Sequence, residues 1–243
     1  MKVVAIIQAR LGSTRLPKKI FFDLSGKELL FHVVDRLRPS KYINEIVIAT
    51  TNSFEDNQVE NWAKINGVNC FRGSEENVLE RYFYASKKFE ADIVVRVTAD
   101  DPFKDYRIID EAIHILITND YDFVCNNNPV SFPEGLDVEV LSMKALTKSF
   151  LESKFDFEKE HVTQYIHRNR DKFNIFNIKN DKNLSNLRWT IDTKEDYLFA
   201  KEVYENLFKQ ERFFFPEDIY KLLEEKPHLV EINGAVKKSD LYK

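Results

Sequence analysis

Short apolar runs rich in β-branched residues alternate with longer amphipathic stretches through the first half of the chain. The apolar runs, which are typical of strands buried on both faces, lie at positions 3–9, 45–50, 92–99 and 122–127. The amphipathic stretches, whose apolar residues recur three and four positions apart, lie at 28–37, 55–66, 77–89 and 107–118. Strands that alternate with helices in this way predict a mostly parallel sheet covered by helices on both faces.

The second half of the chain is less regular. Positions 135–142 alternate like a strand, and the segments 173–178 and 187–191 predict two further strands, for which an antiparallel hairpin is one arrangement. Helices are expected at positions 143–153, 159–170, 194–208 and 216–225. Ser74 is a candidate N-cap for the helix at 77–89. Because the chain shows no internal repeat and no obvious linker, we expect one domain over 1–243 with a smaller β excursion.

The order of these elements points to the part of the fold where a ligand would bind. The right-handed crossover rule favours an α/β fold with a Rossmann-like, doubly wound sheet, and ligands of such sheets bind outside the carboxyl ends of the strands. Four polar stretches follow the predicted strands: QARLGSTR at 8–15, TTNS at 50–53, TADDP at 98–102 and TIDT at 190–193. Candidate chemistry is therefore sought in these stretches.

Composition removes several classes of function. The net charge of -4 argues against a general nucleic-acid binder, which needs a broad cationic face. The two cysteines, Cys70 and Cys125, form no CxxC pair, so neither a zinc site nor a disulfide framework is indicated. The apolar N-terminal stretch is too short for a signal peptide, and no apolar run approaches the roughly 20 residues that span a bilayer. We therefore expect a cytoplasmic protein without a membrane or nucleic-acid partner.

A cluster of cations follows the first predicted strand and consists of Arg10, Arg15, Lys18 and Lys19. The loop lacks the spacing of a P-loop and that of a dinucleotide-binding GxGxxG motif. Its Gly-Ser-Thr stretch at 12–14 can nevertheless turn amides and hydroxyls toward a phosphate. This density of cations suits a triphosphate better than a monophosphate. The alternative is a solvated cationic loop that pairs with surface acids.

Carboxylates follow two other predicted strands. Asp100 and Asp101 come directly after the strand at 92–99, and Asp192 follows the apolar segment at 187–191. One or two carboxylates beside substrate phosphates are what Mg²⁺ takes in proteins. The alternatives are ordinary, since Asp-Asp-Pro opens many turns and Asp192 can cap the next helix. The metal interpretation holds only if these carboxylates and the cationic loop meet in space.

Several motifs, in this order, resemble one family. IIQARLGSTRLPKK, RVTADDP, GLDVEV, EHVTQYI and LRWTIDTKEDY are similar to the SpsF-like family of spore coat polysaccharide biosynthesis, related to the CMP-Kdo and CMP-acylneuraminate synthetases. The resemblance covers nearly the whole chain. It implies a Rossmann-like, GT-A-type nucleotidyltransferase fold and the transfer of a nucleoside monophosphate, most often from CTP, to a sugar or other acceptor with release of pyrophosphate.

The resemblance also implies roles for individual residues. The expected nucleotide-binding residues are Gln8, Ala9, Arg10, Gly12, Ser13, Arg15, Lys19, Gly73, Ser74 and Thr98. Arg15 and Lys19 would stabilise the leaving pyrophosphate as catalytic residues, and Asp100 and Asp192 would be catalytic as the ligands of Mg²⁺. Two positions depart from the usual family pattern. Asp101 replaces a cysteine and adds charge beside the metal carboxylate, and Gln164 replaces a proline.

The acceptor pocket is indicated less directly. The loop at 126–140 has polar groups, two prolines and a glycine after a predicted strand, and Glu134 and Asp137 are its candidate acceptor contacts. His161, at the start of a predicted helix, is a third. The alternatives are a rigid turn for the loop and a structural role for the histidine.

The leading hypothesis is a Mg²⁺-dependent cytidylyltransferase that makes a CMP-activated precursor for a surface polysaccharide. A GT-A-type glycosyltransferase with a nucleotide-sugar donor is the nearest alternative, although a triphosphate donor needs the cationic loop most. A catalytically inert nucleotide-binding protein is a third. A homodimer is expected by analogy with the family, with the β excursion as the contact. The sequence leaves open the acceptor and the choice between CTP and another triphosphate.

Overall fold

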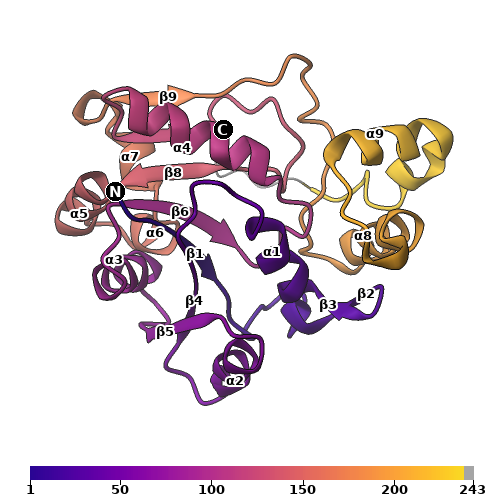
Figure 1. The fold of residues 1–243 in the computed structure, drawn as a ribbon, viewed down its shortest axis with the longest axis horizontal. Helices are drawn as coiled ribbons and strands as arrows, with labels where there is room; N and C mark the ends of the chain where they lie inside the picture. The colour runs from indigo at the N-terminus through magenta and orange to yellow at the C-terminus, as the bar shows by residue number, and fades with distance from the viewer. Residues whose placement is uncertain (238–243) are drawn as a thin grey trace.

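The computed structural model describes residues 1–237 and is built around a seven-stranded sheet (Figure 1). The strands, in spatial order, are β5 (Asn69–Gly73), β4 (Glu45–Thr51), β1 (Val3–Gln8), β6 (Ile93–Thr98), β8 (Glu139–Ser142), β7 (Phe123–Cys125) and β9 (Ile175–Asn177). Only β8 runs antiparallel to its neighbours. The predicted α/β fold with a mostly parallel sheet is confirmed.

Helices cover both faces of the sheet. One face packs against α1 (Leu29–Leu37), α2 (Asn57–Ile65) and α4 (Tyr106–Thr118), and the apolar cluster there continues to α8 (Lys194–Leu207) and α9 (Pro216–Glu225), which pack on each other. The other packs against α3 (Val78–Lys88), α5 (Met143–Glu152), α6 (Asp156–Glu160) and α7 (Gln164–Arg168). Short 3₁₀ turns lie at Lys19–Phe21, Arg170–Lys172, Lys209–Glu211 and Pro227–Glu231. In Figure 1, α8 and α9 stand beyond one end of the sheet, while α3 and α5 lie at the other. No helix among the described residues is long and apolar enough to cross a membrane.

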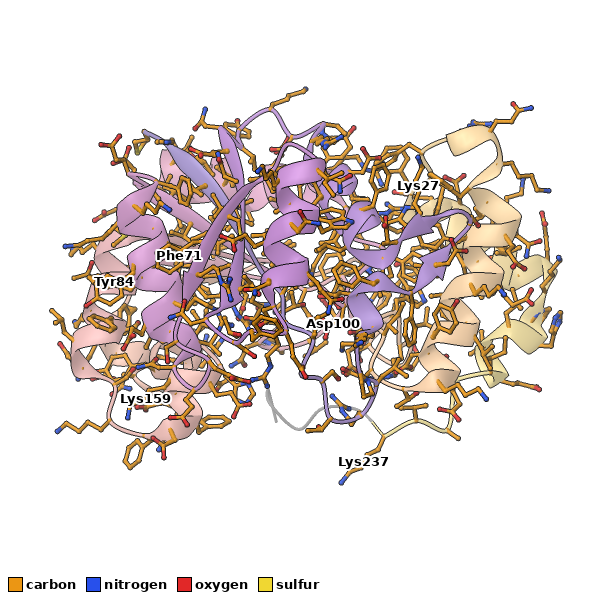
Figure 2. The ribbon with its side chains drawn as sticks, turned by 90° about the horizontal axis from the view of Figure 1, so that it is seen from below. Lys27, Phe71, Tyr84, Asp100, Lys159 and Lys237 are labelled. Carbon is orange, nitrogen blue, oxygen red and sulfur yellow. The ribbon has the colours of Figure 1, made fainter. Side chains whose placement is uncertain are left out.

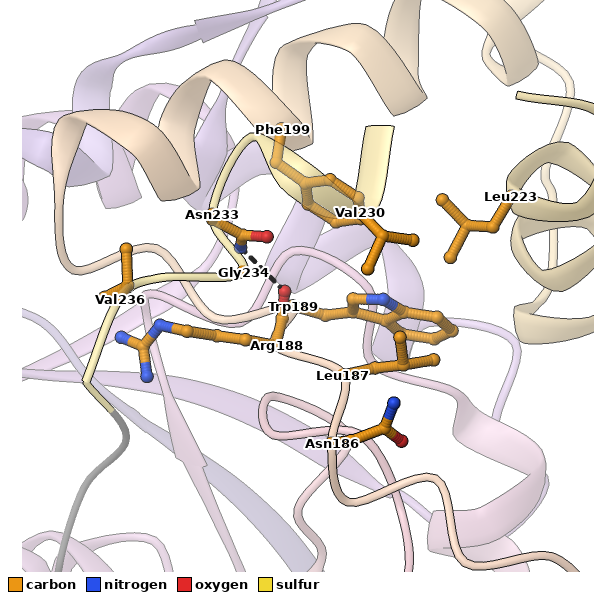
Figure 3. Close-up of a pocket in the computed structure, with 10 residues that line it drawn as sticks. All are labelled: Asn186, Leu187, Arg188, Trp189, Phe199, Leu223, Val230, Asn233, Gly234 and Val236. Carbon is orange, nitrogen blue, oxygen red and sulfur yellow. Dashed lines mark hydrogen bonds between the residues drawn. The ribbon is translucent and has the colours of Figure 1, made fainter. Parts of the chain in front are cut away.

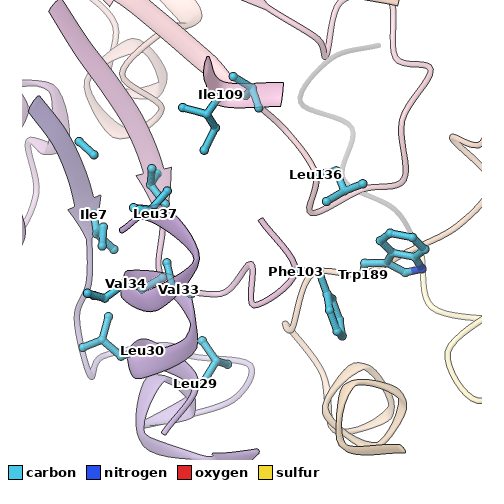
Figure 4. Close-up of a cluster of buried hydrophobic side chains, with 14 of the residues drawn as sticks. Ile7, Leu29, Leu30, Val33, Val34, Leu37, Phe103, Ile109, Leu136 and Trp189 are labelled. Atoms are coloured by element: carbon cyan, nitrogen blue, oxygen red, sulfur yellow. The ribbon is translucent and has the colours of Figure 1, made fainter. Parts of the chain in front are cut away.

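The alternation of side chains along β1 divides the core into two layers. Val3, Ala5 and Ile7 belong to the cluster beneath α1 and α4, whereas Val4 and Ile6 belong to the cluster beneath α3 and α5. Figure 4 shows the stripe of α1 side chains facing β1, as their spacing three and four positions apart predicts. A strand that is apolar at every position is therefore explained by burial on both faces.

The strand order also defines where a ligand site is expected. The chain first adds β4 and β5 on one side of β1 and then places β6 on the other side. The connections that leave β1 and β6 therefore turn in opposite directions, which opens a crevice at their carboxyl ends. The cationic loop after β1 and the Asp-Asp pair after β6 both begin at this crevice.

Three local expectations are corrected. Strand β5 and a two-stranded ribbon, β2 (Asp23–Leu24) with β3 (Lys27–Glu28), were not predicted, because neither has an apolar run. The N-cap of α3 is Asn77, whose side chain accepts from the Glu80 amide, and Ser74 lies one turn earlier. The helix expected at 159–170 is broken into α6 and α7 at Val162, whose φ is +47°. There the Thr163 hydroxyl bonds the buried Glu139 carboxylate, which holds the backbone out of helical geometry.

The suggested hairpin of 173–178 with 187–191 is wrong. The first segment forms β9 in the main sheet, parallel to β7. The second runs past the carboxyl edge of the sheet, where Trp189 N donates to Glu134 O at 2.7 Å and Ile191 N donates to Asp100 O at 2.9 Å. The backbone bonds of this segment are thus satisfied by loops instead of a partner strand, and they bring Asp192 to Asp100.

Candidate active site

The loop after β1 is anchored by the buried Leu11. The buried Leu11 donates its N–H to Asp56 Oδ1 at 2.9 Å, and its carbonyl accepts from Ser13 N and Lys18 N. Arg10, Gly12 and Arg15, by contrast, stay exposed. The loop is therefore held in shape from beneath while its polar groups remain available at the crevice.

Lys19 ends this loop and joins the carboxylates of two distant segments. Its ammonium lies 2.8 Å from Asp100 Oδ2, 2.8 Å from Asp192 Oδ1 and 2.7 Å from the Ile191 carbonyl. Arg15 adds a second cation, with its Nη2 3.0 Å from Asp192 Oδ1. The condition that the cationic loop and the two carboxylates meet in space is therefore fulfilled. Figure 2 places Asp100 near the middle of the molecule, between the sheet layer and the C-terminal helices.

The electrostatics of this cluster keep its members charged. Burial raises the pKa of Asp100, but the Lys19 ammonium outweighs that effect and lowers the pKa to about 2. Burial likewise lowers the pKa of Lys19, and the charges of Asp100 and Asp192 outweigh it, so this pKa rises. Lys19 is therefore an ammonium and Asp100 a carboxylate at neutral pH.

The donor set at this point fits Mg²⁺ in type. Asp100 and Asp192 face one common position, now held by the Lys19 ammonium, and Mg²⁺ completes such a pair with phosphate oxygens and water. Within residues 1–237, no group of three or more His, Cys, Asp or Glu side chains is arranged to hold a metal. A site that depends on substrate phosphates, and not a cage made wholly of protein ligands, is what these residues can provide.

Arg188, which the sequence analysis did not single out, supports Asp192 from behind. Its guanidinium lies 3.0 Å from Asp192 Oδ2, 2.9 Å from Asp196 Oδ1 and 2.7 Å from Glu134 Oε1. The signal for it in the sequence is the spacing of Arg188, Asp192 and Asp196 at successive fourth positions. Without a predicted helix there, that spacing has no obvious meaning.

The charge of Asp101, one of the positions that depart from the family pattern, is compensated by a neighbouring cation. Its carboxylate lies 2.8 Å from the Lys104 ammonium and accepts from the Thr98 hydroxyl at 2.7 Å, and all but a few per cent of the residue is buried. The charge expected beside Asp100 is therefore offset by a lysine that sequence reasoning missed.

The expected nucleotide-binding residues lie along the carboxyl edge of three strands. Gln8 and Thr98 are register partners at the ends of β1 and β6, and Ala9 is buried just beyond β1. Gly73 ends β5 and Ser74 follows it, its carbonyl accepting from the Arg81 guanidinium at 2.6 Å. Their common position at one edge is observed, and their roles in binding remain a prediction.

The three candidate acceptor contacts fall into two groups. Glu134 joins the Asp192 cluster through Arg188. Asp137 lies beside Lys104, whose ammonium donates to the Asp137 backbone carbonyl. Burial raises the pKa of the Asp137 carboxyl to about 7 despite the nearby ammonium. His161 lies elsewhere, against the Phe157 ring at 5.0 Å between centroids, and burial lowers its pKa.

A buried carboxylate that was also missed fixes the segment around His161. Glu139, at the start of β8, pairs with the Arg96 guanidinium and accepts from the Thr163 hydroxyl at 2.8 Å. Burial raises the pKa of Glu139, but Arg96 and His167 outweigh it and hold this pKa well below its usual range. The turn before α7 is thereby bonded to the sheet edge.

Comparison with known proteins agrees with this geometry. The family model described as cytidylyltransferase matches residues 4–233. The spore coat polysaccharide biosynthesis protein SpsF of Bacillus subtilis is 34% identical over 212 residues, which is 84% of this chain and 86% of that protein.

Solved structures agree as well. A cytidylyltransferase from Leptospira borgpetersenii has a TM-score of 0.90 at 34% identity, covering 95% of this chain and 97% of that one. A CMP:2-keto-3-deoxy-manno-octonic acid synthetase complexed with CTP has a TM-score of 0.65 at 18% identity, covering 85% of this chain and 99% of that one. The second likeness is one of fold.

Proposed function

Because the chain belongs to the cytidylyltransferase family and is SpsF-like within it, we propose that it transfers CMP from CTP to a sugar or sugar-like acceptor and releases pyrophosphate. We place this reaction in the synthesis of a surface polysaccharide. The observation that carries the proposal is the convergence of Lys19, Asp100 and Asp192 at the crevice between β1 and β6. A cation and two carboxylates at the ligand-binding edge are what the polyphosphate of a donor and its metal require.

Different residues of the loop after β1 would bind different parts of the donor nucleotide. Arg10, Ser13 and the amides around Gly12, which are at least partly exposed, would bind the phosphates. Arg15 and Lys19 would offset the charge that builds on the departing pyrophosphate. Gly73 and Ser74, beyond β5, would contact the base, and Gln8 and Thr98 the ribose side of the crevice.

Asp100 and Asp192 would hold Mg²⁺ together with the phosphates. When bound there, the ion supplies positive charge beside the α-phosphate. An oxygen of the acceptor attacks the α-phosphorus, a new P–O bond forms, and the bond to the pyrophosphate oxygen breaks with its electron pair. Positioning and charge neutralisation by the cluster supply most of the acceleration.

Glu134, Asp137 and His161 are proposed as the acceptor contacts. Glu134 is fixed by Arg188 beside the metal carboxylate, so an acceptor hydroxyl bonded to it would lie next to the donor site. With a pKa of about 7, Asp137 can donate or accept a hydrogen bond near neutral pH. His161 lies apart from these two residues, in the turn before α7, and is kept as a third proposed contact.

We also propose that two copies assemble, and we place the contact at the end of the molecule opposite α8 and α9 instead of at the β excursion expected from the sequence. Exposed apolar side chains on α3, α5 and the start of α6 lie there, namely Tyr84, Leu151, Phe155 and Phe157. Acids and bases both border them, including Glu152 and Lys172, as a self-complementary contact requires. Figure 2 shows Tyr84 and Lys159 at this end. A monomeric mass by light scattering at micromolar concentration would refute this assembly.

Thermal melting with nucleotides tests the donor assignment. CTP, UTP, GTP and ATP are each added with Mg²⁺ or with EDTA to the wild type and to Asp100→Ala. A ligand that binds only the folded state raises its stability by mass action. We expect CTP to raise the Tm most, more with Mg²⁺ than with EDTA, and to lose the Mg²⁺ increment in Asp100→Ala. Equal shifts by all four triphosphates regardless of metal would defeat the proposal, and a shift by nucleotide sugars alone would favour a glycosyltransferase.

A further inference from the structure

Arg188 connects three carboxylates that come from two segments of the fold. Glu134 lies in the loop between β7 and β8, Asp192 precedes α8, and Asp196 lies in the first turn of α8. The Arg188 side chain is only 3% exposed, so these contacts are shielded from solvent. A guanidinium presents its donors in a rigid plane, which fixes the relative orientation of the groups that it binds.

The contact with Asp192 determines which carboxylate oxygen faces the crevice. Asp192 Oδ2 accepts from Arg188 Nη2 at 3.0 Å, while Oδ1 receives Lys19 and Arg15. The two oxygens are therefore divided between a supporting side and a ligand side. Without Arg188, Oδ2 loses this support, and only Lys19 and Arg15, both on the ligand side, still hold the carboxylate.

Asn233 holds this arrangement from the C-terminal segment. Its amide nitrogen donates to the Arg188 carbonyl at 2.9 Å and to Asp196 Oδ1 at 3.1 Å (Figure 3). Both partners are acceptors, so the amide nitrogen, and not its oxygen, must face them. Asn233 is 4% exposed and lies 37 positions after Asp196. It thus ties a distant part of the chain to the backbone of Arg188.

Apolar packing brings Asn233 to this position. In Figure 3 the Trp189 ring lies among Phe199, Leu223 and Val230, and Asn233 lines the same pocket. The turn that follows is tight, because a Cβ at Gly234 would lie 2.8 Å from the Val230 carbonyl oxygen. The C-terminal segment is therefore built against the back of the candidate active site.

We propose that Arg188 is a positioning residue for Asp192 and that Asn233 fixes Arg188, so that the C-terminal segment controls the divalent-cation site. The inference rests on the proposed function and adds two residues to it. Because the same guanidinium binds Glu134, one group sets both the metal carboxylate and a proposed acceptor contact. Residues that orient metal ligands in this way typically change metal affinity or activity by about 10- to 100-fold when they are replaced.

The test measures CTP binding by calorimetry with Mg²⁺ and, separately, with EDTA. The full chain is used as wild type, Arg188→Lys and Asn233→Ala, at a temperature where each variant is folded by circular dichroism. Arg188→Lys keeps the charge but loses the planar fork. Asn233→Ala keeps Arg188 itself, so it remains informative if the arginine variant does not fold.

Two matched controls address a general loss of stability. Arg107→Lys replaces another arginine between two carboxylates, Asp105 and Glu217. Asn206→Ala removes an asparagine whose amide likewise donates to a backbone carbonyl, that of Glu202, and whose oxygen accepts from Lys226 at the end of α9. Neither residue contacts Asp192 or Arg188 in any recorded hydrogen bond or ion pair.

We expect both test variants to bind CTP about tenfold or more weakly in Mg²⁺ and equally well in EDTA, with both controls unchanged. If the test variants melt earlier but keep the full Mg²⁺ increment, Arg188 is only structural and the inference is wrong. If the wild type binds no CTP in either condition, the proposed function fails and this inference fails with it.

Discussion

The Lys19 ammonium donates to Asp100 Oδ2 at 2.8 Å across 81 positions of sequence. The same nitrogen bonds Asp192, so one cation holds together two carboxylates that would otherwise repel each other. The ammonium thus stands at the position proposed for a divalent cation. The contact between Lys19 and Asp100 has two measurable consequences.

Replacing Lys19 by methionine should leave the carboxylates of Asp100 and Asp192 to repel each other. We expect a lower Tm, and we expect Mg²⁺ without nucleotide to restore part of the loss in Lys19→Met while leaving the wild type unchanged. Loss of a donor that stabilises a departing charge should also reduce pyrophosphate release by about 10²- to 10³-fold. Melting curves with and without Mg²⁺, and a pyrophosphate assay, check this. Lys64→Met, on the exposed face of α2, is the control, and an equal response of both variants to Mg²⁺ would contradict the prediction.

The ion pair of Asp100 with Lys19 should also affect the stability of the protein in acid. The folded-state pKa of about 2 lies below the unfolded value of about 3.9, so its stabilisation is present above pH 4 and is lost as the pH falls toward 2. The difference corresponds to roughly 2–3 kcal/mol at most. Urea unfolding of Asp100→Asn should therefore show a shallower decline in the free energy of unfolding between pH 4 and pH 2 than the wild type. Parallel declines in the two proteins would show that the pair contributes nothing.

The contribution of Asp137 to stability should depend on pH in the opposite direction. Its folded-state pKa of about 7 lies above the unfolded value of about 3.9, so the protein loses stability from this group as the pH rises from 4 to 7. Asn cannot ionise, and Asp137→Asn should raise the Tm by a few degrees at pH 8 and leave it unchanged at pH 4. Melting curves at the two pH values test this. A gain of equal size at both would mean that ionisation is not the cause.

Gly135 should be required for the approach of the segment that carries Asp192. Its φ is +104°, and a Cβ there would lie 2.6 Å from Thr190 N. Gly135→Ala should displace residues 190–192, lower the Tm and remove the Mg²⁺ increment in CTP binding. Gly26→Ala is a matched control, because φ there is +86° but a Cβ would meet nothing within 4 Å. The control should cost only the backbone strain of about 1–3 kcal/mol, and equal effects on CTP binding would refute the steric argument.

The sequence predicted those elements whose apolar pattern is strong. The stripe of α1 and the apolar run of β1 are found where their spacing places them, because burial on one or both faces leaves a periodic record. Strand β5 has no periodic apolar pattern, because its residues NCFRG lie at the sheet edge and are only partly buried. The break at Val162 was equally hidden, because it depends on a bond from Thr163 to Glu139, 24 positions away.

By itself the sequence determined which side chains are candidates and which family the chain resembles, and that resemblance is confirmed. It placed Lys19 and Asp100 beyond buried strands, where parallel sheets bind ligands. Only the tertiary structure decided that Asp192 meets them and that Arg188 and Asn233 stand behind it. The physical reason is that these contacts join loops with no periodic pattern, and their geometry is set by strand order and by backbone bonds between segments far apart in the chain.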